Sequence, residues 1–293
     1  MIMKKLLIAA LLMLFYTAAM AEGERQSVLN AVPDPTRSQT FLLWEEGNMP
    51  AVTVLSPGRS YNDPADFRPN IVTYPVPEGV EVKGAVLVCA GGAFQFRNNQ
   101  YEGTPVAQEL AARGYQAFVV NYRLRPYTQE EGALDLARAV RFVRKHADVY
   151  GFNPEDIAVM GFSAGGILAG EMLISADGYV DGSALDPSYV PDALDMISAD
   201  ASACGMVYSF YGWLSVASTD VETFKASQLP PTYFLYGTED PFVGEFEECV
   251  EALQAANVPV EHHVLQNMPH GFGAWGGWID DYAHFLQECF TNN

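Results

Sequence analysis

The residues best suited to chemistry are three side chains far apart along the chain: Ser163, Asp240 and His270. Ser163 is the centre of a Gly-x-Ser-x-Gly pattern bounded by Gly161 and Gly165. A serine hydroxyl is a weak nucleophile until a base accepts its proton, and an imidazole base needs a carboxylate to orient it. The chain order serine, aspartate, histidine is the order expected of hydrolases that carry their nucleophile between a strand and a helix. These residues predict acyl transfer through an acyl-serine.

The context of Ser163 gives the pattern its meaning. Residues 157–160 are apolar and predict a strand, and residues 167–174 predict a helix. A serine in so abrupt a turn must hold a strained backbone, and glycines two residues away on each side remove the clash of a Cβ. The N–H of Ala164 would then lie at a helix start, free to bind an oxyanion. The alternative is that Ser163 is an ordinary helix N-cap.

The candidate acid and base both follow predicted strands. Asp240 comes after the extended run 232–237, and His270 lies in a Gly-rich loop after the run 260–265. Glu239 is an alternative acid, but Asp240 precedes a proline in a turn and is better placed. His270 could be a loop histidine without a catalytic role. The remaining histidines are predicted to be ordinary polar residues, on the last strand or in helices: His262, His263, His146 and His284.

A second source of oxyanion donors is expected after an early strand. The apolar run ending at Cys89 leads directly into Ala90-Gly91-Gly92-Ala93-Phe94. Small residues let backbone amides approach a developing negative oxygen closely. The alternative is that Gly91 and Gly92 form only a turn.

These candidates must be positioned by an α/β fold, because predicted strands and helices alternate from residue 71 onward. The strands are expected at 82–89, 117–122, 157–161, 205–210, 232–237 and 260–265, and the helices at 104–113, 131–149, 164–174, 244–256 and 275–290. Residues 85–89 are apolar on both faces, as in a strand between two helical layers. Regular alternation predicts right-handed crossovers and a mainly parallel central sheet with helices on both faces. Sites in such sheets form at the carboxyl ends of the strands.

Residues 1–21 are predicted to be an export signal, so the protein is expected to be periplasmic or extracellular. Lys4 and Lys5 precede the apolar run 6–15, and Ala19-Met20-Ala21 fits the small-x-small cleavage rule. The apolar run is short for a spanning helix, and no stable membrane anchor is expected; an uncleaved N-terminal anchor is the alternative. Residues 22–293 are expected to form a single domain, with an N-terminal extension at 22–69 and a surface insert or cap over the site at 176–202.

Composition narrows the partners. Hydrophobic residues make up 49% of the chain, and loss of Lys4 and Lys5 would take the formal net charge from −20 to −22. Such a negative charge argues against nucleic acid as a partner and favours a neutral substrate, although it also serves solubility.

Cys89 and Cys204 lie in apolar runs and are predicted core residues, whereas Cys249 and Cys289 lie in helical patterns and could pair. No spacing indicates zinc, and the acidic residues of the insert fit solvated charge better than a calcium loop. No metal or cofactor is expected.

The chain resembles the alpha/beta-hydrolase superfamily, and more narrowly the exported carbohydrate esterases similar to acetyl xylan esterases and bifunctional feruloyl and acetyl xylan esterases. The matching segments follow the family order: 43–47, 90–94, 101–103, 121–124, 135–144, 161–166, 237–243 and 269–272. The resemblance implies that Ser163 is the nucleophile, that His270 is the base and then the acid, and that Asp240 orients it. It also implies oxyanion donors at Ala164 and at Gly92 or Ala93. This chain departs from its relatives at Ala90, where they carry His or Pro, and at Ile167, where they often carry His.

The expected substrate is a small ester or an acylated oligosaccharide. Acetyl groups on a plant polysaccharide come first, and a feruloyl or general short-chain ester is the alternative. A serine exopeptidase or a noncatalytic binding protein on this scaffold stays open, as does the oligomeric state. The insert is expected to form part of the pocket wall, together with Phe94, Phe96, Arg97, Tyr101 and Trp275. The aromatic rings of this set suit sugar rings and aryl groups, but they could equally be packing residues.

Overall fold

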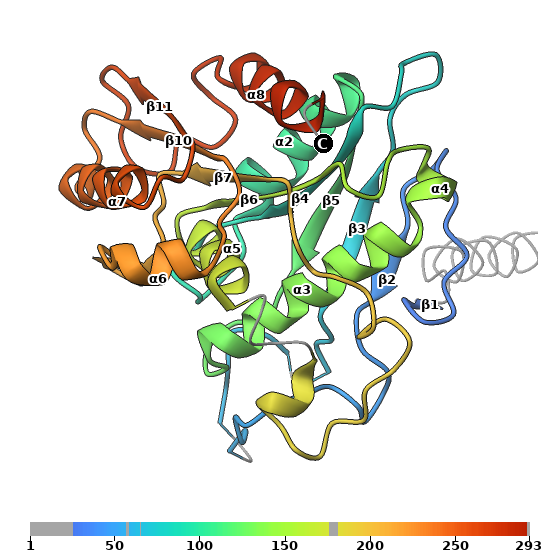
Figure 1. The fold of residues 1–293 in the computed structure, drawn as a ribbon. Helices are drawn as coiled ribbons and strands as arrows, with labels where there is room; N and C mark the ends of the chain where they lie inside the picture. The colour runs from blue at the N-terminus through green and yellow to red at the C-terminus, as the bar shows by residue number, and fades with distance from the viewer. Residues whose placement is uncertain (1–25, 57–58, 65, 176–180, 292–293) are drawn as a thin grey trace, which may run out of the picture.

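A computed structural model describes residues 26–56, 59–64, 66–175 and 181–291, which are built around one twisted nine-stranded sheet (Figure 1). The strand order is β1-β2-β3-β5-β4-β6-β7-β10-β11, and β8 and β9 form a separate two-stranded hairpin. Neighbouring strands run parallel from β5 to β11, while β3 is antiparallel to both β2 and β5. The predicted α/β class with a mainly parallel sheet is confirmed. The strands are β1 (Gln26–Ser27), β2 (Thr40–Leu42), β3 (Asn70–Tyr74), β4 (Gly84–Cys89), β5 (Tyr115–Asn121), β6 (Ile157–Phe162), β7 (Ala203–Val207), β8 (Gly212–Trp213), β9 (Val216–Ala217), β10 (Thr232–Gly237) and β11 (Val260–Leu265).

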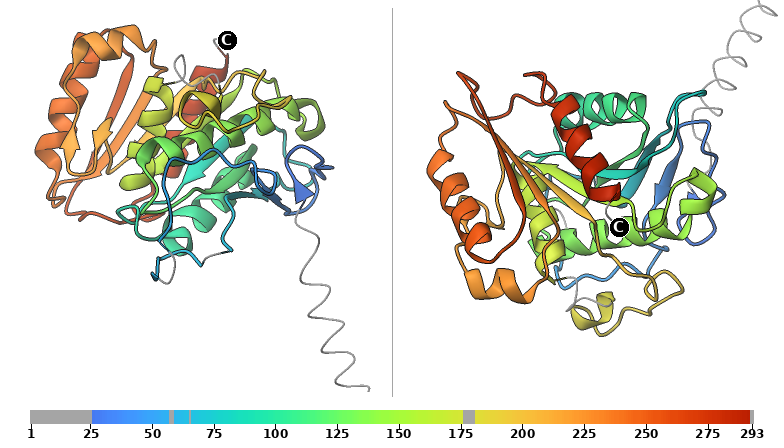
Figure 2. Two further views of the ribbon diagram at one scale, coloured as in Figure 1. Left: turned by 90° about the horizontal axis from the view of Figure 1, so that it is seen from below. Right: turned by 45° about the horizontal axis from the view of Figure 1, so that its top comes forward.

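Helices cover both faces of the sheet (Figure 2). Helices α2 and α8 lie side by side on one face, and α3 and α5 pack against each other on the opposite face. A short π-helical turn, Asn99–Gly103, immediately precedes α2. The helices are α2 (Thr104–Ala112), α3 (Gln129–Lys145), α4 (Ala147–Tyr150), α5 (Ala164–Ser175), α6 (Val221–Ala226), α7 (Val243–Ala255) and α8 (Ile279–Thr291).

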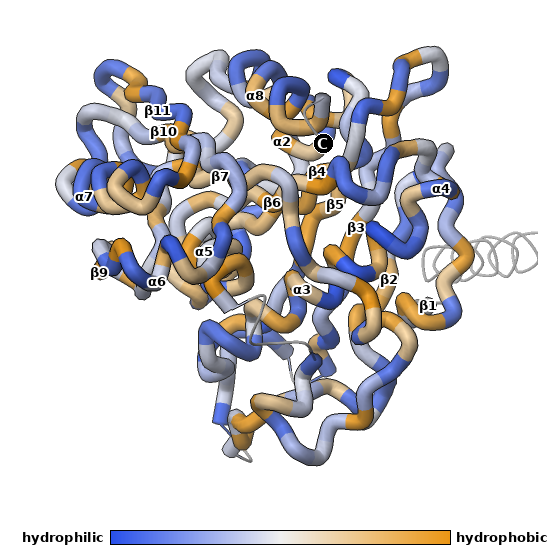
Figure 3. Tube along the Cα trace, in the orientation of Figure 1, coloured by the Kyte–Doolittle hydropathy of each residue, from blue (hydrophilic) through white to orange (hydrophobic). Residues whose placement is uncertain are grey.

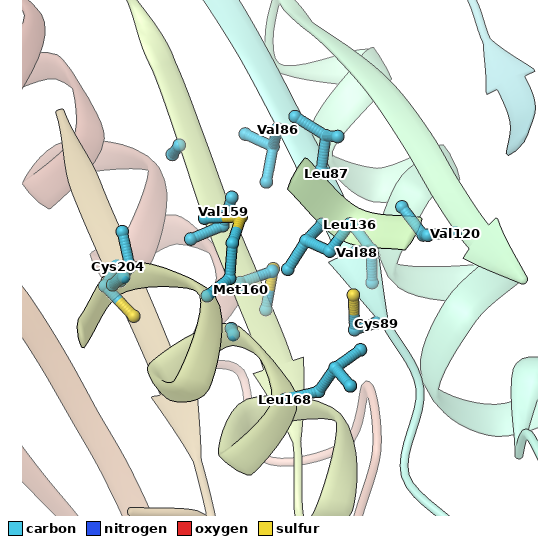
Figure 4. Packing of buried hydrophobic residues seen from close by; sticks show 14 of the residues in the cluster. Val86, Leu87, Val88, Cys89, Val120, Leu136, Val159, Met160, Leu168 and Cys204 are labelled. Atoms are coloured by element: carbon cyan, nitrogen blue, oxygen red, sulfur yellow. The ribbon is translucent and has the colours of Figure 1, made fainter. Parts of the chain in front are cut away.

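The core lies on the central strands. Every residue of β4 and of β6 is buried, and hydrophobic colouring gathers on β4 and β5 (Figure 3). Side chains from these strands meet Leu136 of α3 and Leu168 of α5 (Figure 4). Both strands are paired along both edges, β4 with β5 and β6, and β6 with β4 and β7, and this pairing holds their carboxyl ends in one place.

Three predicted elements end or begin elsewhere. The helix expected over 131–149 stops at Lys145, because His146 leaves helical geometry and its Nδ1 lies 2.9 Å from the carbonyl oxygen of Phe142. The helix expected from residue 275 begins at Ile279, since Gly276 and Gly277 before it adopt positive φ. Strand β7 ends at Val207 instead of residue 210, because Tyr208 has φ of 37°. That turn directs Tyr208 into the site described below.

The N-terminal extension and the insert pack on α3. Residues 51–55 form no strand, and the N–H groups of Val52 and Thr53 donate to the Glu131 carboxylate on α3. In the insert, Asp192 and Asp195 accept hydrogen bonds from Arg138 of α3. Hydrogen bonds join residues 181–202 to α3, to residues 48–51 and to residues 155 and 157, and the Tyr189 ring packs on Trp44. This part of the insert therefore lies along α3.

Three further predictions concern the cysteines, membrane spans and the export signal. The four cysteines are free thiols, with Cys89, Cys204 and Cys249 buried and Cys289 partly buried. Within the described residues, no helix has the length and apolarity needed to cross a bilayer. The predicted export signal at 1–21 lies outside the described residues.

Candidate active site

The structure brings Ser163, His270 and Asp240 into one hydrogen-bonded chain. His270 Nδ1 lies 2.7 Å from Asp240 Oδ2, and His270 Nε2 lies 2.9 Å from Ser163 Oγ. An ionised carboxylate can only accept, so the imidazole proton belongs on Nδ1 and Nε2 is left to accept the serine proton. The Asp240 side chain is fully buried, while that of His270 is 30% exposed. This is the geometry of a nucleophile with its base and an orienting acid.

The turn that carries Ser163 is strained and sterically crowded. Ser163 has φ of 49° and follows β6 directly. A Cβ on Gly161 would lie 2.2 Å from the carbonyl carbon of Gly165, and a Cβ on Gly165 would lie 2.1 Å from the carbonyl oxygen of Cys89. Ser209 Oγ donates to the Ser163 carbonyl oxygen at 2.7 Å and holds the turn from the neighbouring strand end. The two glycines of the pattern are therefore steric requirements of the serine's position.

The loops after β10 and β11 are joined to each other, which aligns acid and base. The N–H of Glu239 donates to the carbonyl oxygen of Met268 at 3.0 Å, and the N–H of Asn267 donates to Thr238 Oγ1 at 2.8 Å. Asp240 also accepts from the N–H of Phe242 at 3.0 Å. Glu239, the alternative acid, is exposed and has no contact with the imidazole among its hydrogen bonds. Asp240 is the carboxylate that reaches His270.

The Gly-rich loop after β4 lies directly against the serine. A Cβ on Gly91 would be 2.6 Å from the Phe162 carbonyl oxygen and 3.0 Å from Ser163 Cβ. Gly92 has φ of 133°, a conformation that only glycine adopts readily. Within the described residues, the N–H groups of Gly92 and Ala93 have no hydrogen-bond acceptor, and neither has that of Ala164 at the start of α5. These amides are available to a ligand oxygen beside Ser163.

Ala90 cannot brace this loop with its own side chain, and other residues do so. Tyr122 Oη donates to the Ala90 carbonyl oxygen at 2.6 Å. The N–H of Gly91 donates to Glu102 Oε2, also at 2.6 Å. Both contacts are buried, so they hold the loop without competition from water.

Glu102 is a functional-site residue that sequence reasoning did not single out for a role. Its Oε1 accepts from Tyr208 Oη at 2.9 Å, and Tyr208 Oη in turn accepts from the N–H of Gly273 in the histidine loop at 3.1 Å. The Tyr208 ring also packs on the His270 ring, with centroids 4.9 Å apart. Burial raises the pKa of Glu102, and its hydrogen bonds from Gly91 and Tyr208 oppose that rise.

Glu102 therefore joins the Gly-rich loop to the histidine loop. The available sequence signal was a glutamate inside the short segment 101–103 that carried the resemblance, just before a helix. The π-helical turn that contains it is a type of turn often found at functional sites.

The residues predicted to line the pocket divide into two groups. Phe94 is 7% exposed and packs against Tyr122, and Arg97 is tied to Asp63 and to the Tyr122 carbonyl oxygen, so both are used inside the structure. Phe96, Tyr101 and Trp275 instead expose 58%, 53% and 71% of their surface.

The three exposed rings belong to the loops that surround Ser163. Phe96 closes the turn that starts at Gly92. The Tyr101 backbone lies against Gly273, and Trp275 follows Phe272 in the histidine loop. An aromatic rim around the serine suits a sugar ring or an aryl group.

No arrangement for a metal is found at this site. Within the described ranges, no group of three or more His, Cys, Asp or Glu side chains could hold a metal ion. The acidic residues of the insert cap turns or pair with arginines, as in the contacts of Asp181, Asp186, Asp192, Asp195 and Asp200; Asp177 lies outside the described residues.

Comparisons with known proteins identify the fold family of this chain. Residues 86–274 match a family described as alpha/beta hydrolase fold. An endo-1,4-beta-xylanase B of Butyrivibrio fibrisolvens is 28% identical over 74% of this chain and 38% of its own length. An acetylxylan esterase of Xylanibacter ruminicola is 26% identical over 70% of this chain and 44% of its own length. The chain thus spans less than half the length of either relative.

Solved structures share the fold. An acetyl ester-xyloside bifunctional hydrolase from Caldicellulosiruptor lactoaceticus superposes with a TM-score of 0.64 at 24% identity, covering 88% of this chain and 97% of that one. Esterase 2 of Thermogutta terrifontis superposes with a TM-score of 0.60 at 19% identity, covering 89% and 96%. With a family match over more than half of its residues and this sheet topology, the chain belongs to the alpha/beta hydrolase fold family.

Proposed function

We propose that this protein is a serine carboxylesterase that removes acetyl groups from acylated oligosaccharides of the xylan type. The observation that carries the proposal is the continuous chain from Ser163 Oγ through the His270 imidazole to Asp240, beside amides that have no acceptor among the described residues. A noncatalytic protein has no need for a strained serine at φ of 49° with a base at hydrogen-bonding distance.

The mechanism follows from the assigned protons. Ser163 Oγ attacks the ester carbonyl carbon while His270 Nε2 accepts the hydroxyl proton, and Asp240 stabilises the imidazolium that forms. The amides of Ala164 and of Gly92 or Ala93 bind the oxyanion, each donor contributing roughly 2.7–4 kcal/mol to the transition state. His270 then protonates the leaving alcohol. Water, activated by the same imidazole, hydrolyses the acyl-serine and restores the enzyme.

The choice of substrate rests on two supports. The exposed rings of Phe96, Tyr101 and Trp275 offer stacking surfaces to sugar rings. Two similar proteins bear the names acetylxylan esterase and acetyl ester-xyloside bifunctional hydrolase. A feruloyl ester is the second candidate, because the same aromatic rim would accept an aryl acyl group. We also propose export, on the basis of the signal pattern at 1–21.

The test compares the wild type with Ser163→Ala. Acetate release from acetylated xylo-oligosaccharides, ferulate release from feruloylated ones and hydrolysis of a small aryl acetate are measured in parallel. We expect acetate release that Ser163→Ala lowers by at least about 10⁴-fold. Ser227→Ala, at the end of α6, is the matched serine control and should keep wild-type activity. A fluorophosphonate should add one label to the wild type and none to Ser163→Ala, as seen by intact mass.

Two results would contradict the proposal. Ester hydrolysis that survives Ser163→Ala would remove the mechanism. Cleavage of aminoacyl arylamides without any ester cleavage would favour a peptidase instead.

A further inference from the structure

A cavity other than the Ser163 site opens near the Gly-rich loop. It has a volume of about 360 Å³ and lies between the N-terminal extension and the segment that follows β5. Its walls combine aromatic, apolar and basic side chains. The lining residues used below are Arg59, Tyr61, Asp63, Phe67, Arg125 and Tyr127.

The two arginines of this cavity differ from the other arginines of the protein. Every other described arginine pairs its guanidinium with a carboxylate or a carbonyl oxygen. Within the described residues, the guanidiniums of Arg59 and Arg125 have no such partner. Arg59 lies over the Tyr61 ring, 5.8 Å from its centroid. Two unpaired cations lining one cavity are notable in a chain with a formal net charge of −20, where carboxylates outnumber basic groups.

The acidic residue of the cavity does not neutralise these arginines. Asp63 is held by Arg97, whose Nη1 is 3.1 Å from Asp63 Oδ2 and also donates to the Tyr122 carbonyl oxygen at 2.7 Å. Arg97 further lies over the Phe67 ring at 4.4 Å. The charge of Arg97 is therefore already balanced by Asp63, whereas the charges of Arg59 and Arg125 remain available to a ligand.

The cavity is close to the reacting serine. Residues 124–127 follow β5, the Gly-rich loop follows β4 and Ser163 follows β6, and these three strands are adjacent in the order β5-β4-β6. Two strand spacings separate β5 from β6, about 10 Å. The N–H of Arg125 donates to the carbonyl oxygen of Phe94 at 2.9 Å, so a wall segment of the cavity is bonded directly to the Gly-rich loop beside Ser163. An oligosaccharide bound at Ser163 could extend into the cavity.

We propose that this cavity binds a carboxylate-bearing sugar, of the uronic acid class, on the same oligosaccharide whose ester is cleaved at Ser163; this inference rests on the proposed esterase function. A planar guanidinium matches a carboxylate with two parallel N–H donors. Tyr61 and Tyr127 line the same cavity and add aromatic surface against which a sugar ring can pack.

The negative net charge of the protein does not oppose such a ligand. Charges farther away than about 8–10 Å are largely screened at physiological ionic strength, so the nearby arginines dominate the local field. A long polyanion would still be repelled, whereas a single carboxylate on an otherwise neutral chain would be selected.

The test uses two acetylated xylo-oligosaccharides that are identical except for one glucuronosyl branch. The measured quantity is the ratio of kcat/KM for the acidic over the neutral substrate. We expect the wild type to prefer the acidic substrate and the Arg59→Ala/Arg125→Ala double variant to lower the ratio by about fivefold or more. Arg125→Lys, which keeps the charge but loses the fork, should recover part of the ratio. Arg37→Ala, which removes an exposed arginine paired with Asp34, is the matched control and should leave the ratio unchanged.

Binding is measured separately by calorimetry with Ser163→Ala, which cannot consume the substrate. The acidic oligosaccharide should bind more tightly than the neutral one, and added salt should reduce the difference. Acetate release from both substrates at equal kcat/KM in wild type and double variant would overturn this inference and leave the esterase proposal intact. Failure of the wild type to cleave any ester would overturn both.

Discussion

Tyr208→Phe tests whether the buried link between the Gly-rich loop and the histidine loop holds the site together. The substitution removes one oxygen and keeps the ring, so the packing against His270 and Phe272 is retained. The lost hydroxyl donates to Glu102 at 2.9 Å and accepts from the N–H of Gly273 at 3.1 Å. Because Tyr208 is 1% exposed, water cannot replace it without rearrangement.

The magnitude follows from these two bonds. A hydrogen bond to a charged group contributes about 1.5–3 kcal/mol, and a buried N–H left without an acceptor costs about 1–3 kcal/mol. The two effects overlap, so we expect Tyr208→Phe to lower the free energy of unfolding by about 3 kcal/mol. We also expect kcat to fall, since the loop that carries His270 loses its anchor, with KM changed less.

The assay is urea unfolding followed by circular dichroism, with aryl acetate kinetics on the same samples. Tyr233→Phe is the matched control, because the Tyr233 hydroxyl is buried and has no hydrogen-bond partner in the part of the chain that the structure describes. Removal of that hydroxyl should be neutral or slightly stabilising. If the two variants differ in unfolding free energy by less than about 0.5 kcal/mol, the anchoring role of Tyr208 is refuted.

Three other substitutions probe the surroundings of the site. Gly91→Ala would place a Cβ 2.6 Å from the Phe162 carbonyl oxygen, and we expect the displaced loop to lower kcat/KM about 100-fold or more with near-native circular dichroism; full activity would contradict the steric argument. Glu102→Gln tests linkage: burial raises the folded pKa of Glu102 above its ordinary 4.5, so the stability it contributes is fully present below pH 4.5 and is lost as pH rises through the folded pKa. The Tm deficit of this variant should therefore be largest near pH 4 and shrink toward pH 8, and a deficit that grows with pH would refute the assignment. Asp135→Ala leaves the fully buried Arg123 guanidinium without its carboxylate, and urea titration should show a loss of about 3–5 kcal/mol; a loss below 1 kcal/mol would contradict the pairing.

The layered fold and much of the candidate site could be predicted from the sequence. The runs at 85–89 and 157–160 are apolar throughout, as in strands covered on both faces, and their alternation with helical patterns predicted the layered fold. The glycines around Ser163 were predictable because the steric demand of that turn is local. The strand-end positions of Asp240 and His270 followed from the alternation of elements.

Other features depended on contacts between distant segments. Residues 51–55 form no strand, because the Glu131 carboxylate takes the N–H groups of Val52 and Thr53 that a sheet would have used. Glu102 could not be assigned a role from sequence, because a glutamate ahead of a helix is normally solvated and its burial depends on three partners from 91, 98 and 208.

The sequence by itself therefore predicted the layered fold and the candidate nucleophile and base, Ser163 and His270, and narrowed the candidate acid to Asp240 or Glu239, because periodicity and local backbone strain depend on neighbouring residues. The tertiary structure decided that Asp240 and not Glu239 reaches the imidazole, that Tyr122 and Glu102 brace the Gly-rich loop, and that Arg59 and Arg125 line one cavity. These contacts depend on which strand ends are adjacent in the sheet and on the conformation of each loop. Interactions among residues far apart in the sequence determine both.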